Sequence, residues 1–401
     1  MTTTDQTRPL GLAADSRAGF RPSILVDGRV MQDRYHGLGR YAFELLSELS
    51  RRQVDLIILY NPDRGRLNVG ELLARPGVRA VPSRVPVVSL RSQWLLWRSV
   101  LAFRPDVVFI PYHLSTPVLH GRVPVVSLIP DCVFERDAAA QGRSAFSVAY
   151  TTATRLAVRS AATLATLSAA SRQDIRRFYK VELPAAAVLS AGVSHRWFSA
   201  AGRPRPDGLD LPDRYILHVG AQRPHKNQRV LVEALAALRS DLPDLGLVLV
   251  GQPDPRFSDE VGELTAALGL SDRVRRYTHV DDETLLCLYA NAAVFGFPSL
   301  VEGFGLPVLE AMAAGLPVVA SDAEAVKEAA GGGAVIVPAR EASEWAQALA
   351  RVLGDPQFAR DLTERGRAVA ARHTWSRSAE RALALLTASV RGAAAEGENV
   401  V

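Results

Sequence analysis

Two carboxylates that stand eight positions apart, Glu302 and Glu310, flank a glycine-rich turn and a proline. Pro307 suits the first position of a helix, where its missing N–H costs nothing. We therefore expect Glu302 in a loop, Glu310 near the end of the first helical turn, and the N–H groups of residues 303–308 between them. A helix N-terminus that is approached through glycine binds anions, and a carboxylate accepts hydroxyl hydrogen bonds. This order of groups outlines a nucleotide-diphospho-sugar; the alternative is two acids that only complement a helix dipole.

A second loop, residues 218–227, follows an apolar run and precedes a helical pattern. Gly220 lets the backbone approach a phosphate closely. Arg223 and Lys226 add positive charge, the arginine as a fork and the lysine as a point charge. The chain has only three lysines, which makes Lys226 conspicuous. The alternative is a basic pair at an ordinary helix start.

These groups need a framework, and short apolar runs alternate with helix-period segments along the whole chain. The alternation predicts an α/β protein with two doubly wound, Rossmann-like domains, whose ligands bind at the carboxyl ends of the strands. The expected strands are 23–27, 54–60, 106–110, 123–128 and 163–168, then 215–219, 247–250, 274–278, 294–297, 317–321 and 334–337. The expected helices are 39–51, 91–103, 143–160 and 170–180, then 226–240, 258–269, 282–290, 307–314, 322–330, 342–353, 356–372 and 376–392.

The composition is that of a globular protein with reduced thiols. The 401 residues are 48% hydrophobic, and the two cysteines, Cys132 and Cys287, are isolated. No apolar run approaches the ~20 residues of a membrane span, and residues 1–20 lack the apolar centre of a secretory signal. We expect a flexible tail over 1–20 and a cytoplasmic protein.

Charge is divided unevenly between the two halves of the chain. Residues 1–205 hold 28 basic and 15 acidic residues, whereas residues 206–401 hold 19 and 27. The basic half is suited to an anionic acceptor or to the inner face of a membrane, with peripheral contact. The alternative is a solvated arginine-rich surface. No nucleic-acid-binding pattern is present.

The segment PSLVEGFGLPVLEAMAAGLPVVASD, residues 298–322, resembles the signature of retaining glycosyltransferases of family four. The resemblance runs from about Ile24 to Trp375, and the bacterial mannosyltransferase-like branch is the most similar. It implies the GT-B fold, in which two Rossmann-like domains face each other across a cleft. The implied domains are 21–200, with the returning helix 376–392, and 214–373, joined by a linker over 201–213.

The same resemblance implies roles for individual residues. Glu310 would hold the ribose and Glu302 the sugar hydroxyls, while Arg223 and Lys226 would bind the diphosphate. Further contacts with the nucleotide sugar would come from three loops and from the base-binding position. The residues are Gly37, Gly39, Gly220, Val280, Gly303, Phe304, Gly305 and Leu306. The glycines at 37 and 39 are expected in a tight loop between the first strand and the first helix.

The chain departs from the family pattern at two places. The arginine of the diphosphate loop usually stands where this chain has Ala221 or His225, so Arg223 is the nearest substitute. Relatives often carry His-Asp after a strand; Asp131 matches, but Pro130 replaces the histidine. His113 is a candidate for a sugar or acceptor contact, or else a structural histidine at a strand end.

The resemblance implies a hexosyltransferase that needs neither a cofactor nor a metal. Its donor would be a GDP-, UDP- or dTDP-linked sugar, with GDP-mannose the first expectation. The acceptor would be a glycan, a lipid-linked molecule or a small molecule. The alternatives are a non-catalytic sugar-nucleotide-binding partner of another transferase and, more distantly, an epimerase or phosphorylase of the same fold.

Overall fold

The computed structural model describes residues 20–32, 36–63, 67–136, 145–278 and 280–398. The chain forms two compact units. Unit 1 contains residues 1–191 and 375–401, and unit 2 contains residues 192–374. Residues 201–213, predicted as the linker, therefore lie within unit 2.

Unit 1 is built on a parallel sheet of six strands in the order β3-β2-β1-β4-β5-β6. Apolar side chains such as Leu25 and Val108 are buried on one face of this sheet beneath Leu96 and Val100. The strands are β1 (Ser23–Asp27), β2 (Asp55–Tyr60), β3 (Val78–Pro82), β4 (Val107–Ile110), β5 (Val125–Leu128) and β6 (Thr163–Ala165). The helices are α1 (His36–Leu49), α2 (Val69–Leu73), α3 (Leu90–Phe103), α5 (Ala145–Ser160), α6 (Ala169–Tyr179) and α14 (Trp375–Glu398).

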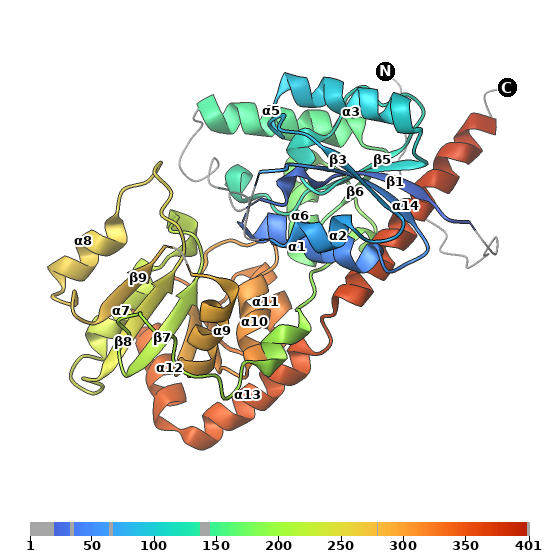
Figure 1. The fold of residues 1–401 in the computed structure, drawn as a ribbon. Coiled ribbons are helices and arrows are strands. Elements are labelled where there is room, and N and C mark those ends of the chain that lie inside the picture. Colours follow the sequence, from blue (N-terminus) through green and yellow to red (C-terminus); the bar gives the residue numbers. More distant parts are fainter. Residues whose placement is uncertain (1–19, 33–35, 64–66, 137–144, 279, 399–401) are drawn as a thin grey trace. The chain divides into compact units, whose positions relative to one another are not determined.

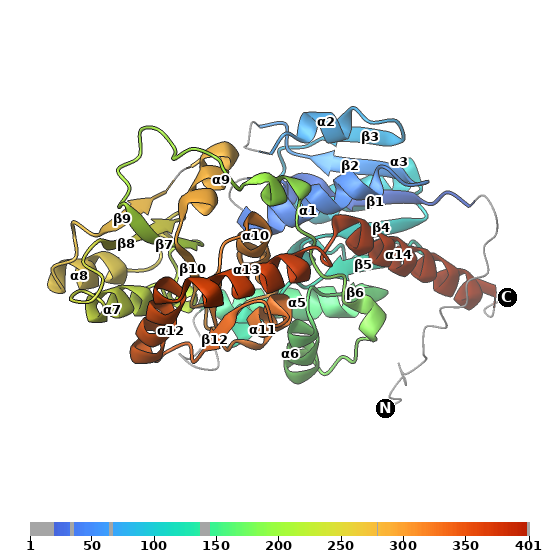
Figure 2. The same ribbon diagram turned by 90° about the horizontal axis from the view of Figure 1, so that it is seen from below.

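Helix α14 comes from the far end of the chain and completes unit 1. It packs along α1 and against β4 and β5 (Figure 2). The ring of Trp375 lies 5.5 Å from that of Tyr41, edge to face, and the hydroxyls of Ser389 and Thr163 are 2.8 Å apart. This helix was expected at 376–392. Among the described helices, none is both long enough and apolar enough to cross a bilayer.

Unit 2 repeats the arrangement with a second six-stranded parallel sheet, in the order β12-β11-β10-β7-β8-β9 (Figure 1). Its core includes Trp345 and Leu231, both fully buried. The strands are β7 (Arg214–Val219), β8 (Leu245–Val250), β9 (Val274–Tyr277), β10 (Val294–Phe297), β11 (Val318–Ser321) and β12 (Val335–Val337). The helices are α7 (Arg229–Ala237), α8 (Glu260–Ala267), α9 (Asp282–Asn291), α10 (Leu306–Ala314), α11 (Glu324–Ala330), α12 (Ala342–Gly354) and α13 (Pro356–Ala370).

The two sheets have the same topology, because β7-β8-β9 and β10-β11-β12 occupy the places of β1-β2-β3 and β4-β5-β6. In such a sheet the connections reverse direction between two central neighbours. The loops after those two strands diverge and leave a crevice at their carboxyl ends. In unit 2 these neighbours are β7 and β10.

Candidate functional site

The predicted basic loop and the predicted acidic loop meet at the reversal point of the second sheet. Residues 220–228 follow β7 and residues 298–305 follow β10, and these two strands are hydrogen-bonded neighbours. The N–H of Leu300 donates to the carbonyl of His225 at 2.7 Å, which joins the two loops directly. Side chains on both loops are thereby held at the place where a parallel sheet binds its ligands.

The β7 loop ends in a single 3-10 turn, Pro224–Lys226, and not in the start of a long helix. Asn227 follows with a φ of 50°, a left-handed conformation that asparagine tolerates. Its side-chain amide donates to the carbonyls of Pro298 (3.2 Å) and Ala339 (2.6 Å). The helix predicted from residue 226 therefore begins at Arg229, and Lys226 lies in a loop that is fastened to the strand ends beside it.

Lys226 and Glu302 form an ion pair, with 2.5 Å between Nζ and Oε1. The two side chains are only 18% and 12% exposed. Such a pair places a donor for anions directly beside an acceptor for hydroxyl groups. The family resemblance predicts that Lys226 binds the diphosphate and Glu302 the sugar hydroxyls, and the structure places these two side chains within hydrogen-bond distance of each other.

The loop after Glu302 leads into the N-terminus of α10. Gly305 is the N-cap with a φ of 109°, a conformation that favours glycine, and Pro307 is the second helical residue. The amides of Phe304, Gly305 and Leu306 precede or open the helix, where no intrahelical acceptor can reach them. The positive end of the α10 dipole is at this position as well, so the segment suits an anion.

Glu310 is the fifth residue of α10, one residue further into the helix than expected from the sequence, because the helix begins at Leu306 and not at Pro307; Glu310 is 7% exposed. Gly303 and Phe304 are also buried. The ring of Phe304 packs 5.9 Å from that of His373 at the end of unit 2. The two carboxylates of the motif thus belong to different environments, with Glu302 in the loop and Glu310 on the helix behind it.

Arg223, the substitute for the family's arginine, is engaged by an acid. Its Nε lies 3.0 Å from Oδ2 of Asp254. Asp254 also pairs with Arg256, whose hydrogen bond holds the pKa of that carboxyl far below its usual range, with Arg223 adding to the effect. The charge of Arg223 is therefore offset within the loop pair, and its role on a diphosphate stays a prediction.

Two histidines lie within residues 218–227, and neither has a predicted role in binding the diphosphate. His218 is fully buried, with Nδ1 2.9 Å from the carbonyl of Gly296, and burial lowers its pKa to about 4. A Cβ at Gly220 would lie 3.0 Å from His218 Nε2, so a side chain at this position would crowd the buried imidazole. Burial and the neighbouring Lys226 lower the pKa of His225 to about 3. In the sequence, the burial of His218 is indicated only by its position inside the apolar run that forms β7.

The prediction that Gly37 and Gly39 lie in a loop before the first helix is wrong. Both residues lie in the first turn of α1. A Cβ at Gly39 would stand 2.7 Å from the carbonyl of Val30, whereas one at Gly37 would meet nothing within 4 Å. Gly39 is therefore required by the close passage of the chain after β1, which the Gly-x-Gly spacing by itself does not reveal.

The remaining predicted residues of unit 1 have different surroundings. His113 is buried, with Nε2 3.1 Å from the hydroxyl of Thr154 and its ring against Tyr112 and Tyr150. Burial lowers its pKa to about 3. These contacts favour the structural alternative for His113. Asp131 follows β5 and is half-buried; its Oδ1 accepts from the N–H of Val133 at 3.2 Å.

Val280, the predicted base-binding position, directly precedes Asp281, which caps α9 through a 2.7 Å bond to the N–H of Thr284. The adjacent His279 lies outside the described residues.

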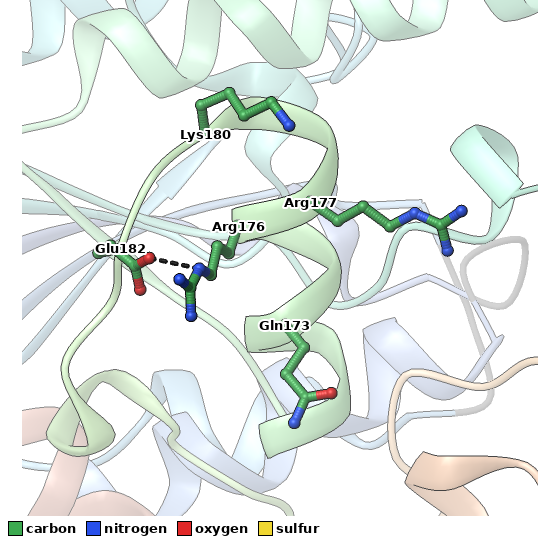
Figure 3. Close-up of a pocket in the computed structure, with 5 residues that line it drawn as sticks. All are labelled: Gln173, Arg176, Arg177, Lys180 and Glu182. Carbon is green, nitrogen blue, oxygen red and sulfur yellow. Dashed lines mark ion pairs between the residues drawn. The ribbon is translucent and has the colours of Figure 1, made fainter.

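A shallow surface hollow lies along α6 in unit 1. It is lined by Gln173, Arg176, Arg177, Lys180 and Glu182 (Figure 3). Arg176 is paired with Glu182 at 2.5 Å, and Figure 3 shows Arg177 pointing away from that pair. Because these side chains diverge, the hollow does not offer convergent ligands. Among the described residues, no group of acids, histidines and cysteines is arranged to hold a metal ion.

This geometry agrees with two families of known proteins. Residues 35–197 match the family described as Glycosyltransferase Family 4, and residues 204–369 match Glycosyl transferases group 1. The chain is a member of glycosyltransferase family four and has the GT-B fold. Solved structures share this fold over most of the chain. Sucrose-phosphate synthase from Thermosynechococcus elongatus superposes with a TM-score of 0.70 at 22% identity, covering 90% of this chain and 96% of the other.

A structure of Anabaena HepE with UDP-glucose gives a TM-score of 0.70 at 18% identity, with 90% and 99% coverage. Among curated proteins, the MMP alpha-(1->4)-mannosyltransferase of Mycolicibacterium hassiacum is 36% identical over 207 residues, which are 51% of this chain and 48% of that protein. The D-inositol 3-phosphate glycosyltransferase of Nocardia farcinica is 36% identical over 180 residues, or 43% and 40%. The chain thus spans about half the length of the curated relatives it matches, or less.

Proposed function

We propose that this protein transfers a hexose from a nucleotide-diphospho-sugar to an acceptor hydroxyl, with retention of configuration. The observation that carries the proposal is the 2.5 Å contact between Lys226 and Glu302 at the reversal point of the second sheet, just ahead of the N-terminus of α10. The ammonium of Lys226 and the amides before α10 are suited to a diphosphate, and the carboxylate of Glu302 beside them is suited to sugar hydroxyls.

In this proposal the donor exchanges partners with the ion pair. The diphosphate takes the ammonium of Lys226 together with the amides of residues 303–306, while Glu302 accepts from sugar hydroxyls. Glu310 holds the ribose diol. As the bond between sugar and phosphate breaks, negative charge grows on the diphosphate oxygen, and fixed positive groups near that oxygen lower the barrier. One such donor contributes about 3–4 kcal/mol.

Retention follows if the acceptor hydroxyl attacks from the face on which the diphosphate leaves. The C1–O bond to the diphosphate breaks with both electrons going to the phosphate oxygen, and the acceptor oxygen forms the new C1–O bond. The acceptor proton passes to the departing phosphate oxygen. This route requires no protein base, which agrees with the use of Glu302 as a binding group.

Mannose is our first proposal for the sugar. The support is that relatives matching about half of the chain include proteins named as mannosyltransferases, among them the serotype-specific WbdA of Escherichia coli, 30% identical over 200 residues that are 48% of this chain and 24% of that protein. HepE is a contrasting case, since its structure holds UDP-glucose. We therefore rank GDP-mannose first and UDP- and dTDP-sugars next, with a glycan, lipid-linked or small-molecule acceptor.

A non-catalytic sugar-nucleotide-binding partner is the competing function. It is favoured by Pro130, which stands where relatives often carry the histidine before Asp131, and by the ion pair that occupies Arg223. Binding of a donor alone would fit either function, so turnover decides between them.

The test begins with thermal unfolding of the full chain against GDP-, UDP-, dTDP- and ADP-sugars. A ligand at 100 times its dissociation constant adds about 2.7 kcal/mol to the free energy of unfolding, which is readily measured. The stabilising donor is then incubated with the protein, and its hydrolysis or transfer is followed by proton NMR of the anomeric signal. We expect turnover and an α-linked product from an α-linked donor. Binding without turnover favours the partner function, and an inverted product refutes the mechanism.

A further inference from the structure

Helix α3 of unit 1 exposes a row of large apolar side chains. Leu90, Trp94, Trp97 and Leu101 are 90%, 57%, 37% and 56% exposed, and their spacing places them along one stripe of the helix. The opposite side of α3 holds Leu96, which is buried in the core against the sheet. The apolar side chains of the outward stripe therefore do not contribute to the core of unit 1.

The apolar surface continues from α3 through a neighbouring loop to α5. Gln93 donates to the carbonyl of Thr116 at 3.0 Å and accepts from the N–H of Val118 at 2.9 Å. The hydroxyl of Ser160, at the end of α5, donates to the carbonyl of Pro117 at 2.5 Å. Figure 1 shows α3 and α5 along the same side of the first sheet. Further exposed apolar side chains on these segments are Val118, Leu119, Val148 and Leu156.

The charged side chains of α3, of α5 and of the loop at residues 111–122 are all positive. The segments 90–104, 111–122 and 145–160 contain no aspartate or glutamate. One of their arginines, Arg98, lies over the ring of Trp94 at 4.6 Å. The exposed arginines of the three segments are Arg91, Arg98, Arg104, Arg122, Arg155 and Arg159.

We infer that this surface, which we call the α3 face, docks on an anionic lipid bilayer at the level of the headgroups. Exposed tryptophans and leucines among arginines are the chemistry of an interfacial helix: the apolar groups enter the headgroup boundary and the cations meet lipid phosphates. A second copy of the chain fits poorly, because two faces of the same positive charge would repel. The inference does not depend on the proposed function, since all residues of the α3 face lie outside the donor loops.

The test is co-sedimentation of the full chain with vesicles of phosphatidylcholine alone and of phosphatidylcholine mixed with phosphatidylglycerol. We expect binding to the mixed vesicles only, weakened by added salt because the attraction is screened. Each arginine brought to the surface contributes roughly fivefold in the partition constant, so Arg91→Glu/Arg98→Glu should lower it by at least about 25-fold. Trp94→Ala/Trp97→Ala should lower it about tenfold or more.

Phe257→Ala is the matched control. Phe257 is an exposed aromatic residue in unit 2, 45% accessible, with Arg256 5.7 Å from its ring, as Arg98 lies over Trp94. This variant should bind vesicles like wild type, and circular dichroism should show every variant folded at the temperature of the assay. Equal binding to both vesicle types, or α3-face variants that bind like wild type, would overturn the inference. Self-association that the same substitutions abolish would also overturn it, since the face would then be an interface between copies.

Discussion

Replacement of Lys226 by alanine should lower both the turnover and the stability of this protein. The change removes the ammonium that we place on the diphosphate and leaves Glu302 without its partner at a site where both side chains are more than four-fifths buried. We expect turnover to fall about 10²–10³-fold, the effect of losing one electrostatic donor in a transition state. Stability should fall as well, because an orphaned, largely buried charge costs roughly 1–3 kcal/mol.

A double-mutant cycle with Glu302→Ala makes the reasoning quantitative. In a domain of the size of unit 2, 1–3 kcal/mol lowers the melting temperature by roughly 2–12 °C. The double variant removes both charges, so it should recover part of that loss, whereas its turnover should stay low. The assays are steady-state kinetics on the stabilising donor and circular dichroism melts of the four proteins.

Lys327 and Glu324 provide the control pair. Their 2.7 Å ion pair has similar chemistry, but the side chains are 41% and 67% exposed on the surface of α11. Exposed pairs of this kind contribute less than about 1 kcal/mol, so Lys327→Ala should leave both turnover and melting nearly unchanged. Our account of the site would be refuted if Lys226→Ala had wild-type turnover, or if the double variant regained activity together with stability.

Three further predictions concern the same unit. Glu310→Gln should weaken the binding of the nucleoside diphosphate and of the nucleotide sugar alike, by about 10- to 150-fold, in calorimetry; unchanged affinity for the nucleoside diphosphate would remove Glu310 from the ribose. Burial lowers the pKa of His218 from 6.5 to about 4, so its contribution to stability is complete above pH 6.5 and is lost as the pH falls towards 4, with a slope of up to ~1.4 kcal/mol per pH unit. His218→Gln should flatten the pH dependence of the free energy of unfolding by that amount, and an equal slope in the variant would contradict the assignment. Gly305→Ala forces a side chain onto a φ of 109° and should cost about 1–3 kcal/mol, measured by urea unfolding; Gly354→Ala, at a position without positive φ and with open space for a Cβ, is the comparison.

The fold could be predicted largely from the sequence, because buried parallel strands are short apolar runs that are easily recognised. Strands such as 294–297 were predicted with the observed bounds. The elements missed were β3 and α2. Most of β3 is exposed at the edge of its sheet, with Arg79 as its second residue, and α2 is a helix of only five residues. Neither carries the continuous apolar pattern on which the prediction depended.

The candidate site was harder to predict, because its defining contacts join distant segments. Lys226 and Glu302 are 76 positions apart, and only the order of the strands brings their loops together. The ion pair between Arg223 and Asp254 joins side chains of two different loops, and the sequence of neither loop predicts it. Likewise, the role of Gly39 depends on the passage of the backbone at Val30, so its spacing from Gly37 suggested a loop where the chain is helical.

The placement of α14 has a consequence for biosynthesis. Unit 2 is inserted in the chain between two parts of unit 1, and Arg52 binds the carbonyl of Ser376 across 324 positions at 2.8 Å. During translation, the surface of α1, β4 and β5 that α14 covers is therefore exposed until every residue of unit 2 has left the ribosome. The α14 side chains that are almost fully buried in the finished protein include Ala379, Ala382 and Leu386. Unit 2 has no such dependence and can fold first. We expect the nascent chain to carry a folded second domain while the first still awaits its last helix, a stage at which apolar surface is open to chaperones and to aggregation.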